Sequence, residues 1–193
     1  MSDYEHKPVW DPLIRIWHWV LVIAIVTEWY LGEFMEFSTI QWHFYLGYVI
    51  LALIAIRIVW GFVGPPPVRF STLFRSIKNI GPYLKHISRR QPSGVPGHNP
   101  LGALSIFAML AVISAQAGIG LFIESEDFFE SGPLAQYIPY DLVGALTHWH
   151  HIFAEVLLVI VIIHVSAILF YLFWKRENLI KPMISGMKQV KKK

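Results

Sequence analysis

Residues 149–174 read WHHIFAEVLLVIVIIHVSAILFYLFW, and this stretch decides the fold. It is long enough to cross a bilayer as a helix, which takes about 20 mostly apolar residues. It also carries His150, His151, Glu155 and His164. Ionisable groups at membrane depth are costly and usually mark a functional site. The sequence therefore predicts a membrane-spanning helix that presents polar side chains to the interior of a bundle.

Three further apolar stretches precede it, over about 13–32, 40–63 and 101–123. Hydrophobic residues make up 55% of the 193 residues, against about 45–50% in soluble domains. We therefore expect an all-α integral membrane protein, with residues 1–193 forming a single membrane domain built as a four-transmembrane-helix bundle, its fourth span at about 149–174. This composition argues against disorder and against nucleic acid as a partner. The absence of cysteine excludes disulfides, iron–sulfur clusters and covalently attached haem.

The charges between the spans predict the orientation. Segment 64–100 carries six Lys and Arg residues and no acid, whereas segment 124–147 carries five acids and no Lys or Arg. The tail after Trp174 is also strongly basic. Because basic loops stay in the cytoplasm, we expect both termini and loop 64–100 to be cytoplasmic and loop 124–147 to be periplasmic.

Loop 64–100 has an apolar residue at every third or fourth position between Phe70 and Ile87. This pattern predicts an amphipathic helix, broken near Gly81 and Pro82, that lies on the anionic inner leaflet. The alternative is a docking surface for a cytoplasmic partner.

Helix geometry selects one histidine from the cluster at the start of the last span. His150 lies fourteen residues before His164, so the two are about 40° apart around a helix and about 21 Å apart along it. His148 and His151 point about 140–160° away from His164. Only His150 therefore shares the face of His164.

Histidines in the first two spans lie at matching depths. His18 lies near the cytoplasmic start of the first span, and His43 lies near the outer start of the second. Helical bundles build cofactor sites from facing side chains. We therefore expect His18 to pair with His164 in the inner half of the bundle and His43 to pair with His150 in the outer half.

A pair of histidines among apolar side chains suits haem better than a bare metal ion. Zinc and non-haem iron need further ligands, whereas haem iron needs only axial ligands from the protein. We therefore expect two non-covalent haem b groups with bis-histidine ligation, His18 and His164 on the inner iron and His43 and His150 on the outer iron. The alternative is that these are core histidines bonded to polar neighbours.

Two arginines lie where haem propionates would need a partner. Arg15 precedes His18 by three residues, and Arg57 follows His43 by fourteen, which places both at the level of the inner haem. One interpretation is that both arginines donate charge-assisted hydrogen bonds to haem propionates. The other is that both side chains extend to the inner membrane interface.

The two acids Glu28 and Glu155 lie toward the outer side of the predicted bundle. His151 and Glu155 are four residues apart and can touch on a helix. One hypothesis is that this pair, with Glu28, exchanges protons with a quinol. The alternative is a structural contact.

Several motifs together resemble the bacterial cytochrome b561 family, which is related to the cytochrome b subunit of nickel–iron hydrogenases. They are VWDPLIRIWHW at 9–19, WH at 42–43, LGY at 46–48, RIVWGFVGP at 57–65, GHNPLGA at 97–103, His150 with Ala154, and HV at 164–165. The resemblance implies a multi-pass dihaem b cytochrome of the bacterial inner membrane that exchanges electrons with the quinone pool. It also implies the ligand pairs His18/His164 and His43/His150. The neighbouring His151 remains a competitor for the outer iron, and His98 is assigned a turn or cap role.

We expect a protein that carries electrons across the membrane between quinol or quinone and a periplasmic redox partner such as a c-type cytochrome. Quinone is then its expected substrate, while its status as an enzyme stays open. The alternative is a haem-bearing membrane anchor subunit of a larger hydrogenase-like oxidoreductase. A small cation transporter is a third reading, although the spans show no broken helices or inverted halves.

Overall fold

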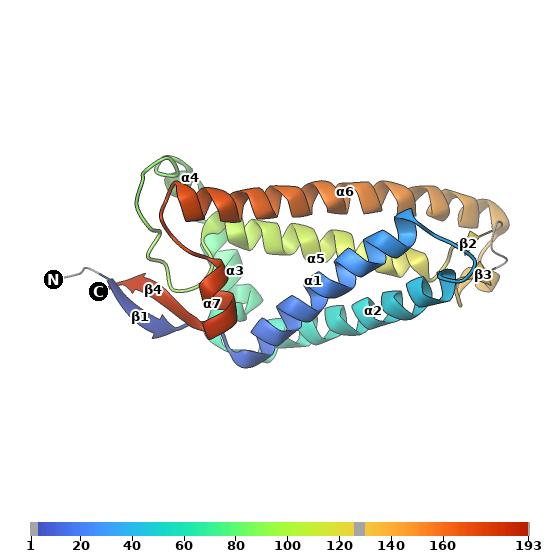
Figure 1. Cartoon of the computed structure of the whole chain (residues 1–193), viewed down its shortest axis with the longest axis horizontal. Helices are drawn as coiled ribbons and strands as arrows, with labels where there is room; N and C mark the ends of the chain where they lie inside the picture. The colour runs from blue at the N-terminus through green and yellow to red at the C-terminus, as the bar shows by residue number, and fades with distance from the viewer. Residues whose placement is uncertain (1–3, 126–129, 193) are drawn as a thin grey trace. The chain divides into compact units, whose positions relative to one another are not determined.

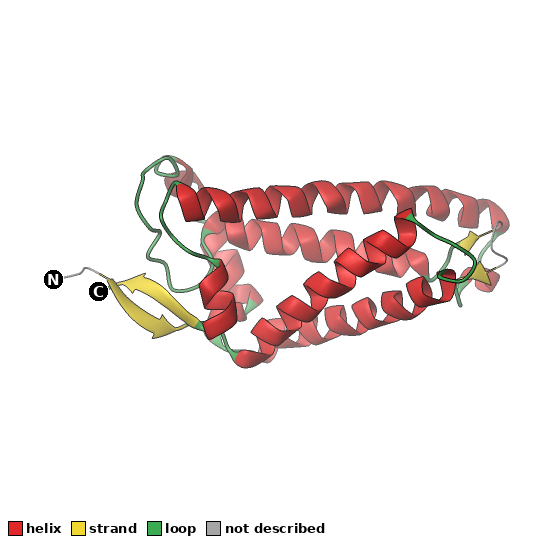
Figure 2. Ribbon diagram, viewed as in Figure 1, coloured by secondary structure: helices red, strands yellow, loops and turns green. Residues whose placement is uncertain are grey.

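The structure is a computed structural model that describes residues 4–125 and 130–192. Glu126 and Asp127 of the acidic loop lie outside the described residues. Helices dominate the described part of the chain (Figure 2).

Four long helices confirm the predicted spans: α1 (Pro12–Glu33), α2 (Ile40–Val63), α5 (Pro100–Gly120) and α6 (Tyr140–Phe173) (Figure 1). Each is long and apolar enough to cross a membrane. In each helix, at most 22% of the apolar stretch is buried within the chain. The remaining apolar surface needs a lipid environment, because water would leave it exposed at a high free-energy cost.

Helix α6 begins nine residues before the predicted boundary at Trp149. Pro139 immediately precedes it, and Asp141 lies in its first turn, where a carboxylate interacts favourably with the helix dipole. This extension mixes apolar residues with Asp141, Thr147 and His148, so it lacks the continuous hydropathy by which the sequence pattern recognised the spans. The rest of the predicted loop 124–147 holds the antiparallel strands β2 (Glu124–Ser125) and β3 (Glu130–Ser131) and the short helix η2 (Ala135–Tyr137).

The segment between α2 and α5 folds into η1 (Pro66–Val68), α3 (Phe70–Ile77) and α4 (Ile80–Leu84). The break between α3 and α4 falls at Lys78–Asn79, just before the predicted Gly81 and Pro82. Pro82 lies in the first turn of α4, where proline costs no helical hydrogen bond.

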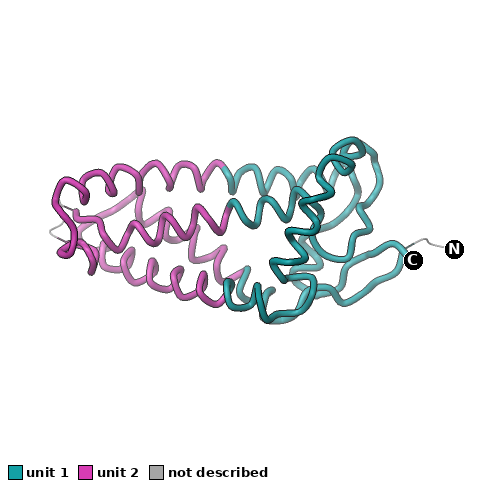
Figure 3. Tube along the Cα trace, turned by 180° about the vertical axis from the view of Figure 1, so that it is seen from behind, with its two compact units in different colours: residues 1–18, 57–108, 160–193 teal, residues 19–56, 109–159 magenta. Residues whose placement is uncertain are grey.

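The chain divides into two compact units, shown in Figure 3. Unit 1 comprises residues 1–18, 57–108 and 160–193. Unit 2 comprises residues 19–56 and 109–159. All four long helices contribute residues to both units.

Unit 1 contains a strand pairing that the sequence analysis did not predict. Strand β1 (Tyr4–Pro8) pairs antiparallel with β4 (Met187–Lys191), with Tyr4 opposite Lys191 (Figure 1). Helix α7 (Ile180–Ser185) ends at Gly186, whose φ of +81° is the left-handed turn that glycine adopts without strain. Both chain ends are thereby tied to one small core: Val9, Trp10, Ile14, Val68 and Val190.

Candidate functional site

In unit 2 the structure brings His43 of α2 and His150 of α6 together. Their ring centroids are 6.3 Å apart and the ring planes are inclined by 74°. Both residues are partly buried. Two metal–nitrogen bonds of about 2 Å, with the half-width of each ring added, span a similar distance of about 6 Å. The pair therefore has the separation of two axial ligands on one metal ion.

The surroundings of this pair fit haem rather than a bare metal ion. Within residues 4–125 and 130–192 there is no group of three or more His, Cys, Asp and Glu side chains that could hold a metal. Two histidines alone do not satisfy zinc or non-haem iron. Haem supplies four nitrogens of its own and takes only the two axial ligands from the chain.

His43 packs against α1 in a cradle formed by Glu28 and Gly32. Its Nδ1 atom is 3.4 Å from a carboxylate oxygen of Glu28, and its ring also interacts with the backbone of Glu28. Gly32 lies one turn further along α1, and a Cβ added there would be 3.5 Å from Cε1 and 3.8 Å from Nδ1 of His43. The Nδ1 edge of His43 therefore faces the backbone of α1.

His150 rests in a matching cradle formed by α5. Its ring interacts with the backbone of Gln116. Gly120 lies one turn further along, where an added Cβ would be 3.4 Å from Cε1 and 3.9 Å from Nδ1 of His150. In both cradles a polar residue is followed four positions later by a glycine that lets the imidazole approach the helix. This approach leaves Nε2 of each ring as the nitrogen available to a metal.

The other polar residues at the start of α6 lie apart from the pair. His148, His151 and Glu155 are all exposed, and the ring of His148 lies against Trp149. The structure therefore brings His150, and not His151, to His43. Glu28, the third member of the hypothetical proton relay, contacts His43.

Unit 1 contains the second histidine pair. His18 of α1 and His164 of α6 are both partly buried and close enough to interact electrostatically. The structure thus brings together the two side chains that were paired by their matching depth.

Arg57 of α2 lies in the interior of unit 1, with only 3% of its surface exposed. It donates a 3.0 Å hydrogen bond from Nη2 to the carbonyl oxygen of Val68, and its guanidinium lies 4.9 Å from the ring centroid of Phe70. Its Nη1 atom is buried and has no hydrogen-bond partner within the described residues. Because a buried donor without a partner is costly, Nη1 fits an anionic group such as a propionate.

Arg15 has a different environment. Its guanidinium donates to the carbonyl oxygen of Ile184 and lies against Gly186. These contacts tie α1 to the end of α7, while Nε of Arg15 is buried without a hydrogen-bond partner in the described residues.

His98 is a residue of this region whose environment the sequence analysis missed. It stacks on Trp10 with ring centroids 4.5 Å apart and lies within electrostatic range of Arg57, His164 and Lys188. Desolvation, reinforced by the positive charges of Lys188 and Arg57, lowers the pKa of His98 to about 3, so the ring is neutral. The predicted cap role belongs to Asn99, whose Oδ1 accepts a 2.8 Å hydrogen bond from the Gly102 amide. The GHNP motif marked the turn without showing which of its side chains closes it.

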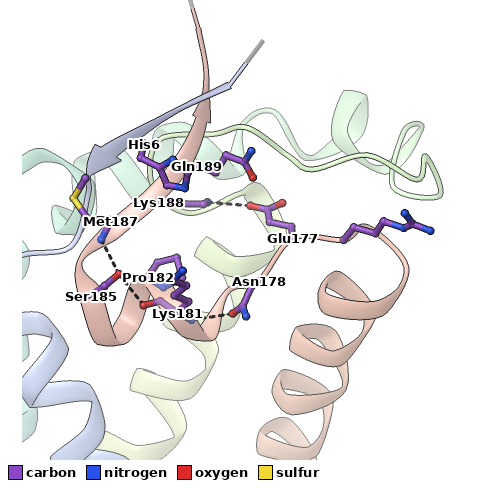
Figure 4. A pocket seen from close by; sticks show the side chains of 10 residues that line it. His6, Glu177, Asn178, Lys181, Pro182, Ser185, Met187, Lys188 and Gln189 are labelled. Carbon is purple, nitrogen blue, oxygen red and sulfur yellow. Dashed lines mark hydrogen bonds and ion pairs between the residues drawn. The ribbon is translucent and has the colours of Figure 1, made fainter. Parts of the chain in front are cut away.

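An ion pair beside the β1–β4 sheet adjoins a cavity of about 490 Å³ (Figure 4). Lys188 Nζ is 3.5 Å from a carboxylate oxygen of Glu177, and both side chains are nearly fully buried. Lys188 also donates to the carbonyl oxygen of Gly97, and Glu177 accepts hydrogen bonds from the amide and hydroxyl of Ser93. Burial lowers the pKa of Lys188, and Glu177 partly offsets this effect. The network joins three segments that are distant in sequence.

Comparisons with known proteins identify a family and several similar sequences. The family model described as prokaryotic cytochrome b561 matches residues 9–186. One similar protein, named "Probable Ni/Fe-hydrogenase B-type cytochrome subunit", is from Azotobacter vinelandii; it is 27% identical, and the match covers 95% of this chain and 88% of that protein. A protein of the same name from Rhizobium leguminosarum bv. viciae is 28% identical, with coverages of 92% and 87%. The "Probable Ni/Fe-hydrogenase 1 B-type cytochrome subunit" of Escherichia coli K12 is 23% identical, with coverages of 73% and 68%.

Proposed function

Because this chain belongs to the prokaryotic cytochrome b561 family, we propose that it is a dihaem b-type cytochrome that carries electrons across the bacterial inner membrane. The observation that supports this most directly is the facing pair His43 and His150, with ring centroids 6.3 Å apart and each ring seated against a glycine.

The residues of the chain have distinct roles in this proposal. His43 and His150 hold the outer haem, and His18 and His164 hold the inner haem. The cradles on α1 and α5 orient the outer imidazoles, which is the usual task of groups that contact a metal-bound histidine. Arg57 offers Nη1 to an inner propionate, and Arg15 offers its buried Nε. When bound, haem b supplies one-electron redox chemistry.

The names of the relatives support a particular partner. Each refers to a nickel–iron hydrogenase, so we propose that this chain is the membrane subunit through which such an oxidoreductase exchanges electrons. A c-type cytochrome as partner remains a prediction from the sequence alone.

We propose a quinone as the second redox partner. The chain itself is surrounded by membrane lipid. Unit 2 has an apolar groove of about 420 Å³, with Ser114, Gly118, Phe122 and Leu142 among its lining residues. Its walls suit a hydrophobic quinone, because such sites are mostly apolar with few polar groups.

A dithionite-reduced minus oxidised spectrum of the purified protein, with haem quantified against protein, tests the proposal. We expect two haem b per chain in the wild type. His150→Ala should lose one of them, and the matched control His151→Ala should retain both. A colourless protein after expression with sufficient haem would contradict the proposal, and loss of haem from His151→Ala alone would reassign the outer ligand.

A further inference from the structure

We propose that Glu28 is a positioning residue for the outer haem: its carboxyl group faces Nδ1 of His43, accepts the Nδ1 proton when the haem is bound, and strengthens that imidazole as an iron ligand. The inference rests on the proposed function, because it assigns a role to Glu28 at a haem that His43 would ligate.

The contact between the two side chains is built into the interior of unit 2. The 3.4 Å separation joins His43 Nδ1 to Oε1 of Glu28, and their side chains are only 17% and 19% exposed. His43 Nδ1 and the other carboxylate oxygen, Oε2, are both buried without a hydrogen-bond partner in the described part of the chain, so the 3.4 Å approach brings donor and acceptor together without closing a hydrogen bond. A carboxyl group at membrane depth is costly, so its placement against the Nδ1 edge of an imidazole calls for a functional explanation.

A glycine makes room for this carboxylate. Gly47 lies four residues after His43 on α2, and a Cβ added there would be 3.5 Å from Oε1 of Glu28. Gly32 and Gly47 therefore flank the contact from α1 and α2. A larger side chain at either position would compete with the imidazole or with the carboxylate for the same space.

The two cradles differ in one respect. The cradle of His43 contains a carboxylate, whereas His150 interacts with the backbone of Gln116, the residue that corresponds to Glu28 in its cradle. A carboxylate is a stronger hydrogen-bond acceptor than an amide or a backbone carbonyl. Acceptance of the Nδ1 proton by a carboxylate fixes the tautomer and raises the basicity of the ligand.

A more basic ligand favours the ferric over the ferrous state. Glu28 should therefore lower the reduction potential of the outer haem relative to a protein with a neutral group at this position.

Replacement of Glu28 by its neutral isostere tests this role. Glu28→Gln keeps the size of the side chain, and Glu33→Gln removes the same charge from an exposed position on the same helix. The measurements are haem per chain, the midpoint potentials from an optical redox titration, and the electron paramagnetic resonance spectrum of the ferric protein.

We expect Glu28→Gln to retain two haems and to raise one of the two one-electron potentials. A change of about tenfold in that reduction equilibrium, typical of a lost contact to a metal-bound histidine, corresponds to about 59 mV for one electron. The ferric resonance of one haem should also shift, because the orientation of the His43 ring changes. Glu33→Gln should change neither reading.

Unchanged potentials and resonances in a Glu28→Gln protein that holds two haems would overturn the inference while leaving the proposed function intact. A wild-type protein without haem at the His43–His150 pair would instead refute the proposed function. If Glu28→Gln loses the outer haem, Gln116→Glu decides the matter. A lower outer potential in that variant supports the inference, and an unchanged one overturns it.

Discussion

Gly120 of α5 lies against the ring of His150 of α6, where an added Cβ would be 3.4 Å from Cε1. This distance is at the limit of ordinary van der Waals contact, so a methyl group fits only tightly. Branched side chains cannot fit without moving the imidazole. The position therefore reports directly on the geometry of the outer histidine pair.

We expect Gly120→Val to lose about one haem per chain, because displacement of His150 removes one axial ligand. Gly118→Val is the matched control, since a Cβ at Gly118 would have no neighbour within 4 Å. Pyridine haemochrome quantification of both purified variants checks the prediction. Equal haem content in the two variants would show that Gly120 does not shape the site.

Arg57→Gln should lower the occupancy of the inner haem and destabilise unit 1. Loss of the buried hydrogen bond from Nη2 to Val68 should cost about 1.5–3 kcal/mol, the range for bonds made by charged groups. The exposed Arg75→Gln serves as the control, because it changes net charge equally. Haem content and thermal unfolding in detergent are the measurements. An Arg57→Gln protein with full haem content would remove the proposed propionate contact.

Breaking the Lys188–Glu177 pair should destabilise the protein far more than breaking an exposed pair. Lys188→Met should cost about 3–5 kcal/mol, because it leaves the buried Glu177 carboxylate without its cation. The Lys188→Met/Glu177→Met double variant should cost less than the sum of the single variants. Lys7→Met is the control, since the exposed Lys7–Glu5 pair should contribute about 0–1 kcal/mol. Equilibrium unfolding of the wild type, Lys188→Met, Glu177→Met and the double variant completes the cycle. Additive effects of the two single substitutions would contradict a coupled pair.

His98 should make stability depend on pH below about 6.5. Its pKa is about 3 in the folded protein and about 6.5 in an unfolded chain. The unfolded state therefore binds the extra proton between these values, and stability falls as the pH falls through this window, by up to about 1.4 kcal/mol per pH unit. At about pH 6.5 the slope is half its maximum, and it vanishes as the pH rises further above this value.

The His98→Phe variant isolates that contribution from the other histidines. Between pH 5 and 6.5 its unfolding free energy should fall less steeply than that of the wild type, by the slope of one proton. Parallel slopes in the two proteins would show that His98 becomes protonated as readily in the folded state as in the unfolded chain.

Bilayer thickness and helix periodicity explain why so much could be predicted from the sequence. A span must be long and apolar, so the four stretches were recognisable without tertiary information. Residues fourteen apart return to nearly the same face of a helix. That rule selected His150 over His151, and matched depth in the membrane paired His18 with His164. The structure brings these side chains to the predicted neighbours.

Features that depend on contacts between distant segments could not be predicted in this way. Nothing in the local pattern indicated that Glu28 meets His43 rather than His151 and Glu155, since that depends on how α1 packs against α2. The pairing of β1 with β4 joins the two ends of the chain, and strand register has no local signature across such a separation.

By itself, the sequence determined the number of spans, the charge asymmetry of the loops and the faces on which the histidines lie. These follow from local composition and from the fixed geometry of a helix. Only the tertiary structure decided which glycines admit the imidazoles, that Asn99 rather than His98 caps α5, and that the basic tail buries Lys188. Each of these depends on which backbone approaches a given side chain, and that is settled only when the helices pack.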